Sequence, residues 1–144
     1  PELITLEVTE SAFVKDLGKS LEVLTRLRMH GFGLSIDDFG TGYSSMQQLA
    51  LLPSTELKLD RSFVDRCYED PSRLAIIESS IELARKLGLK SVAEGVEDEA
   101  TWLLLARLGC DQCQGFFSAR PMPREELLVW HDTWCERLPA LIGR

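Results

Sequence analysis

The chain of 144 residues is 44% hydrophobic and 27% charged, a composition typical of one folded globular domain rather than of a disordered or fibrous protein. Its 16 basic and 23 acidic side chains give a net charge of −7, which argues against nonspecific binding to duplex nucleic acid or to an anionic membrane surface. The longest apolar runs fall far short of the roughly 18 to 20 residues that cross a bilayer, and the N-terminus carries no secretory signal, so we expect a cytoplasmic protein without direct membrane contact.

Predicted strands and helices alternate along the chain. Short apolar runs predict strands over residues 3–8, 33–37, 57–60, 91–94 and 112–117. Helical spacing predicts helices over 19–30, 46–52, 71–87, 99–108 and from Pro123 onward. Three of these helices end in a glycine shortly before the next strand, as expected when crossover helices join parallel strands. We therefore predict an α/β fold with one domain over residues 1–138 and a frayed tail over 139–144.

Polar side chains recur where the predicted strands end. In parallel α/β folds, the loops that follow the strands meet at one face, where ligands and catalytic groups gather. We therefore expect one polar site built from several strand ends. Its candidate residues, in chain order, are Glu7, Glu10, Asp37, Asp38, Lys58, Asp60, Glu94, Glu97 and Gln114.

The adjacent carboxylates Asp37 and Asp38 come directly after a buried apolar strand. They would repel each other there unless a cation or hydrogen-bond donors compensated, and a hard cation such as Mg²⁺ is the simplest compensation. Lys58 stands between two leucines, so in a strand it points away from both, toward a cleft or a barrel interior. An ammonium group there is placed to neutralise a phosphate or to hold an attacking water.

The cysteines and histidines do not predict a metal site of their own. Cys110 and Cys113 have the C-x-x-C spacing of redox sites and zinc knuckles, but no second pair or suitably spaced histidine completes a tetrahedral site. We expect His30 and His131 to be structural or exposed. In a reducing compartment we also expect Cys110 and Cys113 to stay as thiols rather than form a disulfide.

The segment 37–45, which reads Asp-Asp-Phe-Gly-Thr-Gly-Tyr-Ser-Ser, resembles the signature loop of the EAL-domain family, the phosphodiesterases that linearise cyclic di-GMP. Further motifs agree in order over nearly the whole chain, at residues 6–11, 57–60, 92–97, 114–117 and 120–123. The resemblance implies the later strands and helices of a TIM-like (β/α) barrel, which typically needs roughly 250 residues. The family's Glu-Ala-Leu motif and an Asn ligand have no counterpart in this sequence, so we expect the first strands upstream of Pro1.

The same resemblance implies a role for each candidate residue, around two Mg²⁺ or Mn²⁺ ions about 3.5 to 4 Å apart. It makes metal ligands of Glu7, Asp37, Asp38 and Glu94. It assigns catalytic or supporting roles to Lys58, Glu94 and Glu97. It assigns binding of water or of the substrate phosphate to Gln114. It assigns support of the loop after the acidic pair to Glu10, Gly40, Thr41 and Gly42.

The activity that the resemblance implies is hydrolysis of cyclic di-GMP to linear pGpG, with the isolated 144 residues inactive. It also points to a homodimer and to a regulatory domain elsewhere in the parent chain. Two alternatives stay open at this point. One is an inactive barrel that senses cyclic di-GMP. The other is a receiver-like phosphoacceptor, which also uses an acidic pair, Mg²⁺ and a strand-end lysine, although a receiver places its acidic pair after the first strand and its lysine after the last.

Overall fold

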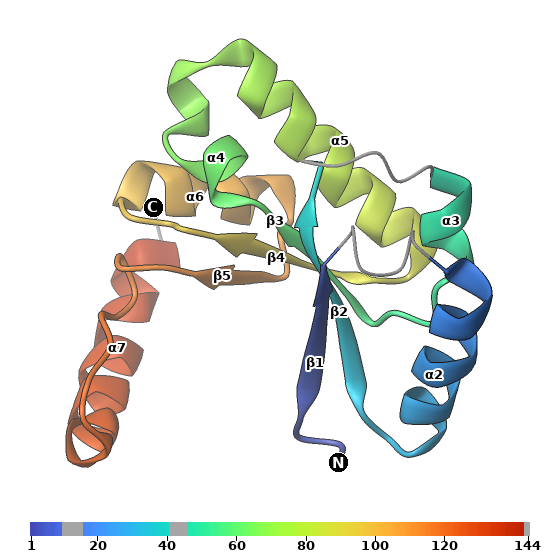
Figure 1. Cartoon of the computed structure of the whole chain (residues 1–144). Helices are drawn as coiled ribbons and strands as arrows, with labels where there is room; N and C mark the ends of the chain where they lie inside the picture. The colour runs from blue at the N-terminus through green and yellow to red at the C-terminus, as the bar shows by residue number, and fades with distance from the viewer. Residues whose placement is uncertain (10–15, 41–45, 143–144) are drawn as a thin grey trace.

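The computed structural model describes residues 1–9, 16–40 and 46–142, and its centre is a parallel sheet (Figure 1). Within those residues the strands are β1 Thr5–Thr9, β2 Gly33–Phe39, β3 Glu56–Leu59, β4 Lys90–Glu94 and β5 Gln112–Gln114. The strands lie side by side in chain order, and each neighbouring pair is parallel. The predicted α/β fold is therefore confirmed. This order also excludes the receiver-like alternative, because receivers have the order 2-1-3-4-5.

Helices connect the strands and follow the last one. Their bounds are α2 Leu17–Met29, α3 Met46–Leu51, α4 Arg61–Val64, α5 Pro71–Leu87, α6 Glu99–Leu108 and α7 Leu127–Ile142, with 3₁₀ turns at η1 Cys67–Glu69 and η2 Arg124–Glu126. The sheet is strongly twisted, so that β1 and β2 run steeply across the direction of β5 (Figure 1). None of the helices in the described ranges is long and apolar enough to cross a membrane.

Local signals in the sequence set the ends of the longer helices. The Asp70 carboxylate accepts hydrogen bonds from the backbone N–H groups of Ser72 and Arg73, and Pro71 occupies the first helical position of α5. Gly88 ends this helix with a left-handed φ of 71°. Asp98 caps α6 in the same way, through a 2.8 Å hydrogen bond from the backbone N–H of Thr101. The helices predicted at these places are therefore confirmed.

The strand ends differ from the predicted bounds at both edges of the sheet. Strand β1 begins at Thr5 rather than at residue 3, and Leu3 is fully exposed. Strand β5 ends at Gln114 rather than at residue 117. After Gln114 the chain turns, with a hydrogen bond from the Ser118 N–H to the Gly115 carbonyl. Apolar composition alone does not show where strand pairing stops, which is why both strands were predicted too long.

Two helical segments also differ from the prediction. The short helix α4 was not predicted; it begins because the Asp60 carboxylate accepts a hydrogen bond from the Ser62 N–H. Helix α7 begins at Leu127, after the η2 turn, rather than at Pro123, and continues through Pro139 to Ile142; residues 143–144 of the expected tail lie outside the described part of the chain. A proline removes one backbone donor, which weakens a helix but does not end it in every case.

The apolar core lies between the sheet and the helices and has two parts. The first joins β2 and β3 to α2, α3 and α5, with the buried residues Leu24, Leu34, Ile36, Leu49, Leu52, Leu57 and Ala84. The second joins β3 and β4 to α4, α5 and α6, with the buried residues Leu59, Val64, Cys67, Ile77, Ile81, Ala93, Val96 and Leu105. Leu57 and Leu59 thus face the helices, and Lys58 between them faces the opposite side of the sheet.

Candidate active site

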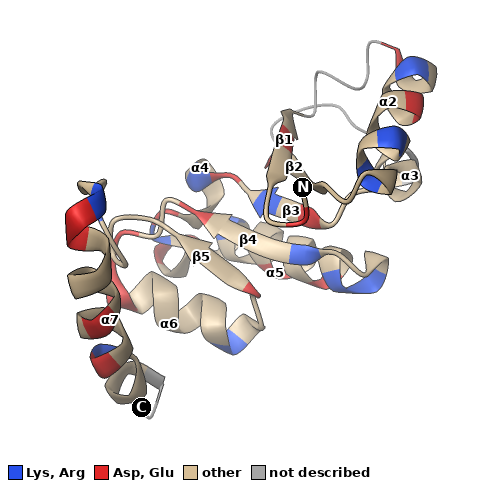
Figure 2. Cartoon of the chain, turned by 90° about the horizontal axis from the view of Figure 1, so that it is seen from below, with Lys and Arg blue, Asp and Glu red and all other residues tan. Residues whose placement is uncertain are grey.

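Lys58 lies at the centre of a charged cluster on the sheet face opposite the helices. Its side chain is only 7% exposed, and its Nζ lies 2.8 Å from Glu7 Oε1 and 2.7 Å from Glu94 Oε1. Asp37 Oδ1 is 3.0 Å from the same nitrogen. Strands β1, β2, β3 and β4 therefore contribute one member each, and we call these four residues the Lys58 cluster. Figure 2 marks acidic positions on both β1 and β4.

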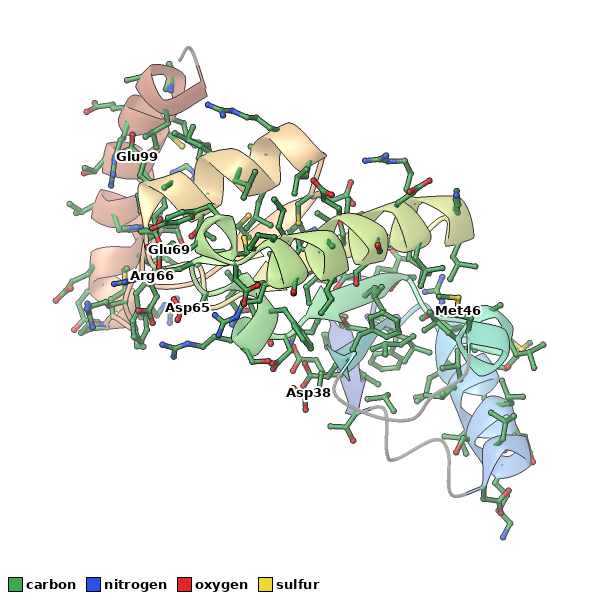
Figure 3. All side chains as sticks on the ribbon, turned by 90° about the horizontal axis from the view of Figure 1, so that it is seen from above. Asp38, Met46, Asp65, Arg66, Glu69 and Glu99 are labelled. Atoms are coloured by element: carbon green, nitrogen blue, oxygen red, sulfur yellow. The ribbon has the colours of Figure 1, made fainter. Side chains whose placement is uncertain are left out.

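A bulge in β2 shapes the cluster. Ile36 pairs with Leu57 and Phe39 pairs with Leu59, so two residues of β2, Asp37 and Asp38, stand opposite the single Lys58 of β3. Asp38 takes up the extra length with a left-handed φ of 57°, a conformation that aspartate tolerates better than most side chains. Figure 3 labels Asp38 at this end of the sheet. The bulge brings the adjacent acids to the same strand end, opposite Lys58.

The environment of Lys58 keeps its side chain protonated. Burial lowers the pKa of the ammonium group, but its close contacts with the carboxylates of Glu7, Glu94 and Asp37 raise the pKa by more, so the pKa lies above its ordinary value of 10.5. A lysine in this state donates hydrogen bonds and supplies positive charge, but it does not act as a base near neutral pH. Counted at formal charges, three carboxylates and one ammonium leave the cluster with a net charge of −2.

The donor set of the cluster fits a hard divalent cation. Asp37 Oδ1 is buried, and its contact with Lys58 Nζ lacks the geometry of a hydrogen bond, so this oxygen has an unfilled acceptor site. Oxygen ligands and excess negative charge suit Mg²⁺ or Mn²⁺. Among the described residues, however, no group of three histidine, cysteine or acidic side chains is arranged around a common metal position. The Lys58 ammonium group occupies the position on which the three carboxylates converge.

A pocket of about 250 Å³ adjoins the cluster and shares Glu94 with it. It is lined by Arg61, Glu94, Gly95, Glu97, Gln114, Gly115 and Phe116. Gln114 reaches it because β5 pairs with β4 in a register that sets Gln114 beside Glu94. Glu97 does not join Lys58; its Oε1 accepts a 2.6 Å hydrogen bond from Arg61 Nη2. The pocket thus presents an amide, carboxylates and an aromatic ring beside the charged cluster.

Two glycines allow close contacts at this pocket. Gly95 has a left-handed φ of 67°, and a Cβ added there would lie 2.3 Å from Cγ of Arg61, whose side chain lines the pocket. A Cβ on Gly115 would lie 2.1 Å from the Val96 carbonyl oxygen, so a larger residue there would push the ends of β4 and β5 apart. Gly115 therefore lets Gln114 lie close to Glu94.

The other candidate residues are placed as follows. Gly40 has a φ of 94° and approaches the ring of Phe63, so it turns the chain sharply after the bulge. Glu10, Thr41 and Gly42 lie outside the described residues. The sequence did not single out Arg61, which reaches the pocket because Asp60 begins helix α4 there. No motif in the sequence signalled that contact.

Comparisons with known proteins agree with this arrangement. The EAL domain family model matches residues 1–121. The bifunctional diguanylate cyclase/cyclic di-GMP phosphodiesterase MucR of Pseudomonas aeruginosa is 51% identical over 129 residues, which are 90% of this chain and 19% of MucR. A solved structure of the PaMucR phosphodiesterase in complex with c-di-GMP matches with a TM-score of 0.83 and 50% identity, and covers 88% of this chain and 51% of that one.

A structure with a metal ion also matches. Klebsiella pneumoniae BlrP1, solved with manganese and cy-diGMP, gives a TM-score of 0.77 at 35% identity over 84% of this chain and 31% of that one. The chain thus spans at most about half the length of each of these matched chains. Because the family model covers most of its residues and its sheet matches theirs, the chain belongs to the EAL domain family.

Proposed function

We propose that the protein carrying this chain is a metal-dependent phosphodiesterase that hydrolyses cyclic di-GMP to linear pGpG. The observation that carries the proposal is the Lys58 cluster, in which three carboxylates from three strands meet at a mostly buried point beside an open pocket. The names of the relatives support the substrate, since they include a cyclic di-GMP phosphodiesterase and structures with this dinucleotide bound.

We assign the metal ligands to Glu7, Asp37, Asp38 and Glu94, as the resemblance implies, with two Mg²⁺ or Mn²⁺ ions. When bound, such ions supply Lewis-acid activation of water and neutralise charge on the phosphodiester. The dinucleotide carries two negative charges, so a cluster with a formal charge of −2 repels it until cations are bound. Metal binding is therefore a condition for substrate binding in this proposal.

The chain's own residues orient the reacting groups. Lys58 stays protonated, so it holds the attacking water or a phosphate oxygen by donating hydrogen bonds, and it does not remove the proton. Glu94, which belongs to both the cluster and the pocket, is placed to accept a proton from that water. The Gln114 amide binds water or phosphate, and Glu97 holds Arg61 at the pocket wall.

The proposal also covers the setting of the domain. Residues 1–138 form the C-terminal part of an EAL-type barrel, and the remaining ligands come from upstream strands. The parent protein is a cytoplasmic homodimer with a regulatory domain elsewhere in its chain. The small share of MucR that this chain spans, 19%, is consistent with further domains in the parent.

The test is a turnover assay on the intact protein. Purified protein is incubated with cyclic di-GMP and Mg²⁺ or Mn²⁺, with and without EDTA, and the cyclic and linear dinucleotides are separated by chromatography. We expect pGpG only when the divalent cation is present, with activity restored when the cation is added in excess over EDTA. Tight binding of cyclic di-GMP without any cleavage would overturn the proposal and identify a sensor.

A further inference from the structure

Cys110 and Cys113 form a thiol pair on the side of β5 away from the Lys58 cluster. Cys110 follows the end of α6, and Cys113 pairs with Ala93 in the β4–β5 ladder. Because side chains alternate along a strand, Cys113 and Gln114 lie on opposite faces of β5. All four cysteines of the chain are free thiols. The pair therefore belongs to a separate place in the molecule, and nothing in the proposed phosphodiesterase reaction uses it.

Both cysteines line a common pocket. The Cys110 thiol donates hydrogen bonds to the Gln112 carbonyl at 3.3 Å and to the Ser91 carbonyl at 3.6 Å, which fixes it beside the pocket. The pocket has a volume of about 300 Å³ and lies between α6, β5 and α7. Its lining includes Trp102, Trp130 and Trp134, which are all the tryptophans of the chain. The pocket is large enough to hold a small molecule such as hydrogen peroxide beside both cysteines.

The walls of this pocket are held in place by specific contacts. Trp130 Nε1 donates a 2.9 Å hydrogen bond to the Ser118 carbonyl, and the Trp130 and Trp134 rings stack with centroids 6.3 Å apart. On the other side, the Asp111 carboxylate accepts hydrogen bonds from the Ser91 N–H at 2.8 Å and the Ser91 hydroxyl at 2.9 Å. Asp111 stands between the two cysteines in sequence, so these bonds fix the short segment that joins them.

The two thiols differ in acidity. The neighbouring Cys113 thiol lowers the pKa of Cys110 to about 7, although burial acts in the opposite direction. Cys110 and burial raise the pKa of Cys113, and burial also raises the pKa of Cys67. Near neutral pH, a fraction of Cys110 is therefore thiolate, the reactive form of the side chain, while Cys113 stays protonated.

We propose that Cys110 and Cys113 are an oxidation site that hydrogen peroxide converts to a reversible intramolecular disulfide. The Cys110 thiolate attacks one peroxide oxygen, so that an S–O bond forms, the O–O bond breaks and hydroxide leaves. The Cys113 sulfur then attacks the Cys110 sulfenic acid; the S–S bond forms, the S–O bond breaks, and the departing hydroxide takes the Cys113 proton as water. The peroxide is reduced by two electrons, and a dithiol reductant restores both thiols by exchange.

The chain offers a direct test, because trypsin leaves Cys110 and Cys113 in one peptide and places each of the other two cysteines in a peptide of its own. Cys110 and Cys113 share residues 108–124, while Cys67 falls in 67–73 and Cys135 in 125–137. The intact protein is treated with hydrogen peroxide at neutral pH, alkylated with N-ethylmaleimide and digested with trypsin. The peptide masses are then measured by mass spectrometry. We expect peptide 108–124 to lack two hydrogen atoms and to carry no label, and to regain two labels after reduction. The other two peptides should stay fully labelled.

Matched variants distinguish specific oxidation of Cys110 and Cys113 from nonspecific oxidation of exposed cysteines. Cys113→Ser removes the second thiol, so the sulfenic acid on Cys110 should persist and be trapped by dimedone. Cys135→Ser removes an exposed cysteine outside the pocket and should leave disulfide formation unchanged. Oxidation of Cys135 at the same rate as Cys110, or a peptide 108–124 that keeps both thiols in excess peroxide, would overturn the proposal.

Two readouts on the unmutated protein keep the test decisive if a variant fails to fold. Alkylation of Cys110 by iodoacetamide should show a midpoint near pH 7, below the value of about 8.5 for an unperturbed thiol. Peroxide should change tryptophan fluorescence, because every tryptophan lines the same pocket, and reductant should reverse the change. A midpoint at the unperturbed value together with unchanged fluorescence would count against the site.

Discussion

Lys58 joins three strands of the site, because its ammonium group contacts a carboxylate from each of them. Its strand neighbours Leu57 and Leu59 are buried against the helices, which forces its side chain to the opposite face, where Glu7, Asp37 and Glu94 lie within 3.0 Å of Nζ. A buried charge is costly unless it is paired, so this ammonium and its carboxylates depend on one another. Any change to Lys58 therefore affects stability as well as chemistry.

Lys58→Met tests that dependence in the intact protein, since it keeps a side chain of similar length and removes the charge. Three carboxylates are then left facing one another, and we expect a loss of about 3 to 5 kcal/mol of unfolding free energy, the range for breaking a buried ion pair. Urea unfolding measures this loss. Lys86→Met is the matched control, because Lys86 pairs with Glu82 at the surface, and its unfolding midpoint should barely move. Equal effects of the two variants would contradict the prediction.

The raised pKa of Lys58 also predicts a dependence of stability on pH. A group whose pKa is higher in the folded state stabilises that state fully below the unfolded value, here 10.5, and loses this contribution as the pH rises further. Unfolding free energy should therefore decline above about pH 10.5 more steeply in the unmutated protein than in Lys58→Met. Denaturant titrations between pH 8 and pH 11.5 test this; parallel curves would show that Lys58 does not contribute.

Asp38→Asn tests the proposed metal role of the bulge residue. Asparagine tolerates a left-handed backbone as aspartate does, so the fold should be kept while a charged oxygen ligand is lost. We expect turnover to fall at least about 100-fold and the Mg²⁺ requirement to rise, with an unchanged circular dichroism spectrum. Asp132→Asn, on α7 far along the chain, should leave turnover unchanged. Full activity of Asp38→Asn at saturating Mg²⁺ would refute the role.

At the scale of elements, two close approaches decide the shape of the pocket. Strand β5 is only three residues long, and its last residue, Gln114, is held beside Glu94 by the β4–β5 register and by the hydrogen bond from the Val96 N–H to the Gln114 carbonyl. Gly115 then passes against the Val96 backbone with no room for a side chain. Because so few backbone hydrogen bonds hold β5 against β4, a small local displacement would be enough to change the position of Gln114.

Gly115→Ala should therefore lower both stability and turnover. The added Cβ meets the Val96 carbonyl, which is backbone and cannot swing away, so we expect about 1 to 3 kcal/mol of destabilisation and a marked fall in kcat in the cyclic di-GMP assay. Gly88→Ala is the matched control. It meets no atom within 4 Å but has a left-handed φ, so it should cost about 1 to 2 kcal/mol and leave kcat unchanged below the melting temperature. Equal kcat values for the two variants would contradict the prediction.

At the scale of the whole molecule, the sheet has an open edge at β1. Within the described residues β1 pairs only with β2, and the segment before it exposes Leu3 and Ile4. A parallel strand with free backbone donors and acceptors is a template for association with another chain. In a closed barrel this edge would be covered by a neighbouring strand.

The isolated 144-residue chain should therefore self-associate, because it has an open edge. On the proposed function it should also show no turnover, since that proposal places further metal ligands in upstream strands. Light scattering and the chromatographic assay measure the two properties. Supplying the parent's upstream strands, in the same chain or as a second polypeptide, should restore a defined oligomer and Mg²⁺-dependent cleavage. Ile4→Lys should reduce association without restoring turnover. Hydrolysis by the isolated chain as a monomer would show that the ligand assignment is wrong.

The sequence by itself determined the alternation of strands and helices and most helix ends, because caps such as Asp70 and terminal glycines such as Gly88 act over a few residues. It also determined the strand-end candidates, since each of them lies at or just after the end of a predicted apolar strand. Only the tertiary structure decided that Lys58 is enclosed by Glu7, Asp37 and Glu94, that Glu97 binds Arg61 instead, and that two acids oppose one lysine at a bulge. The physical reason is that register and bulges arise from pairing between residues about 20 to 34 positions apart in the chain, so a short stretch of sequence does not specify them.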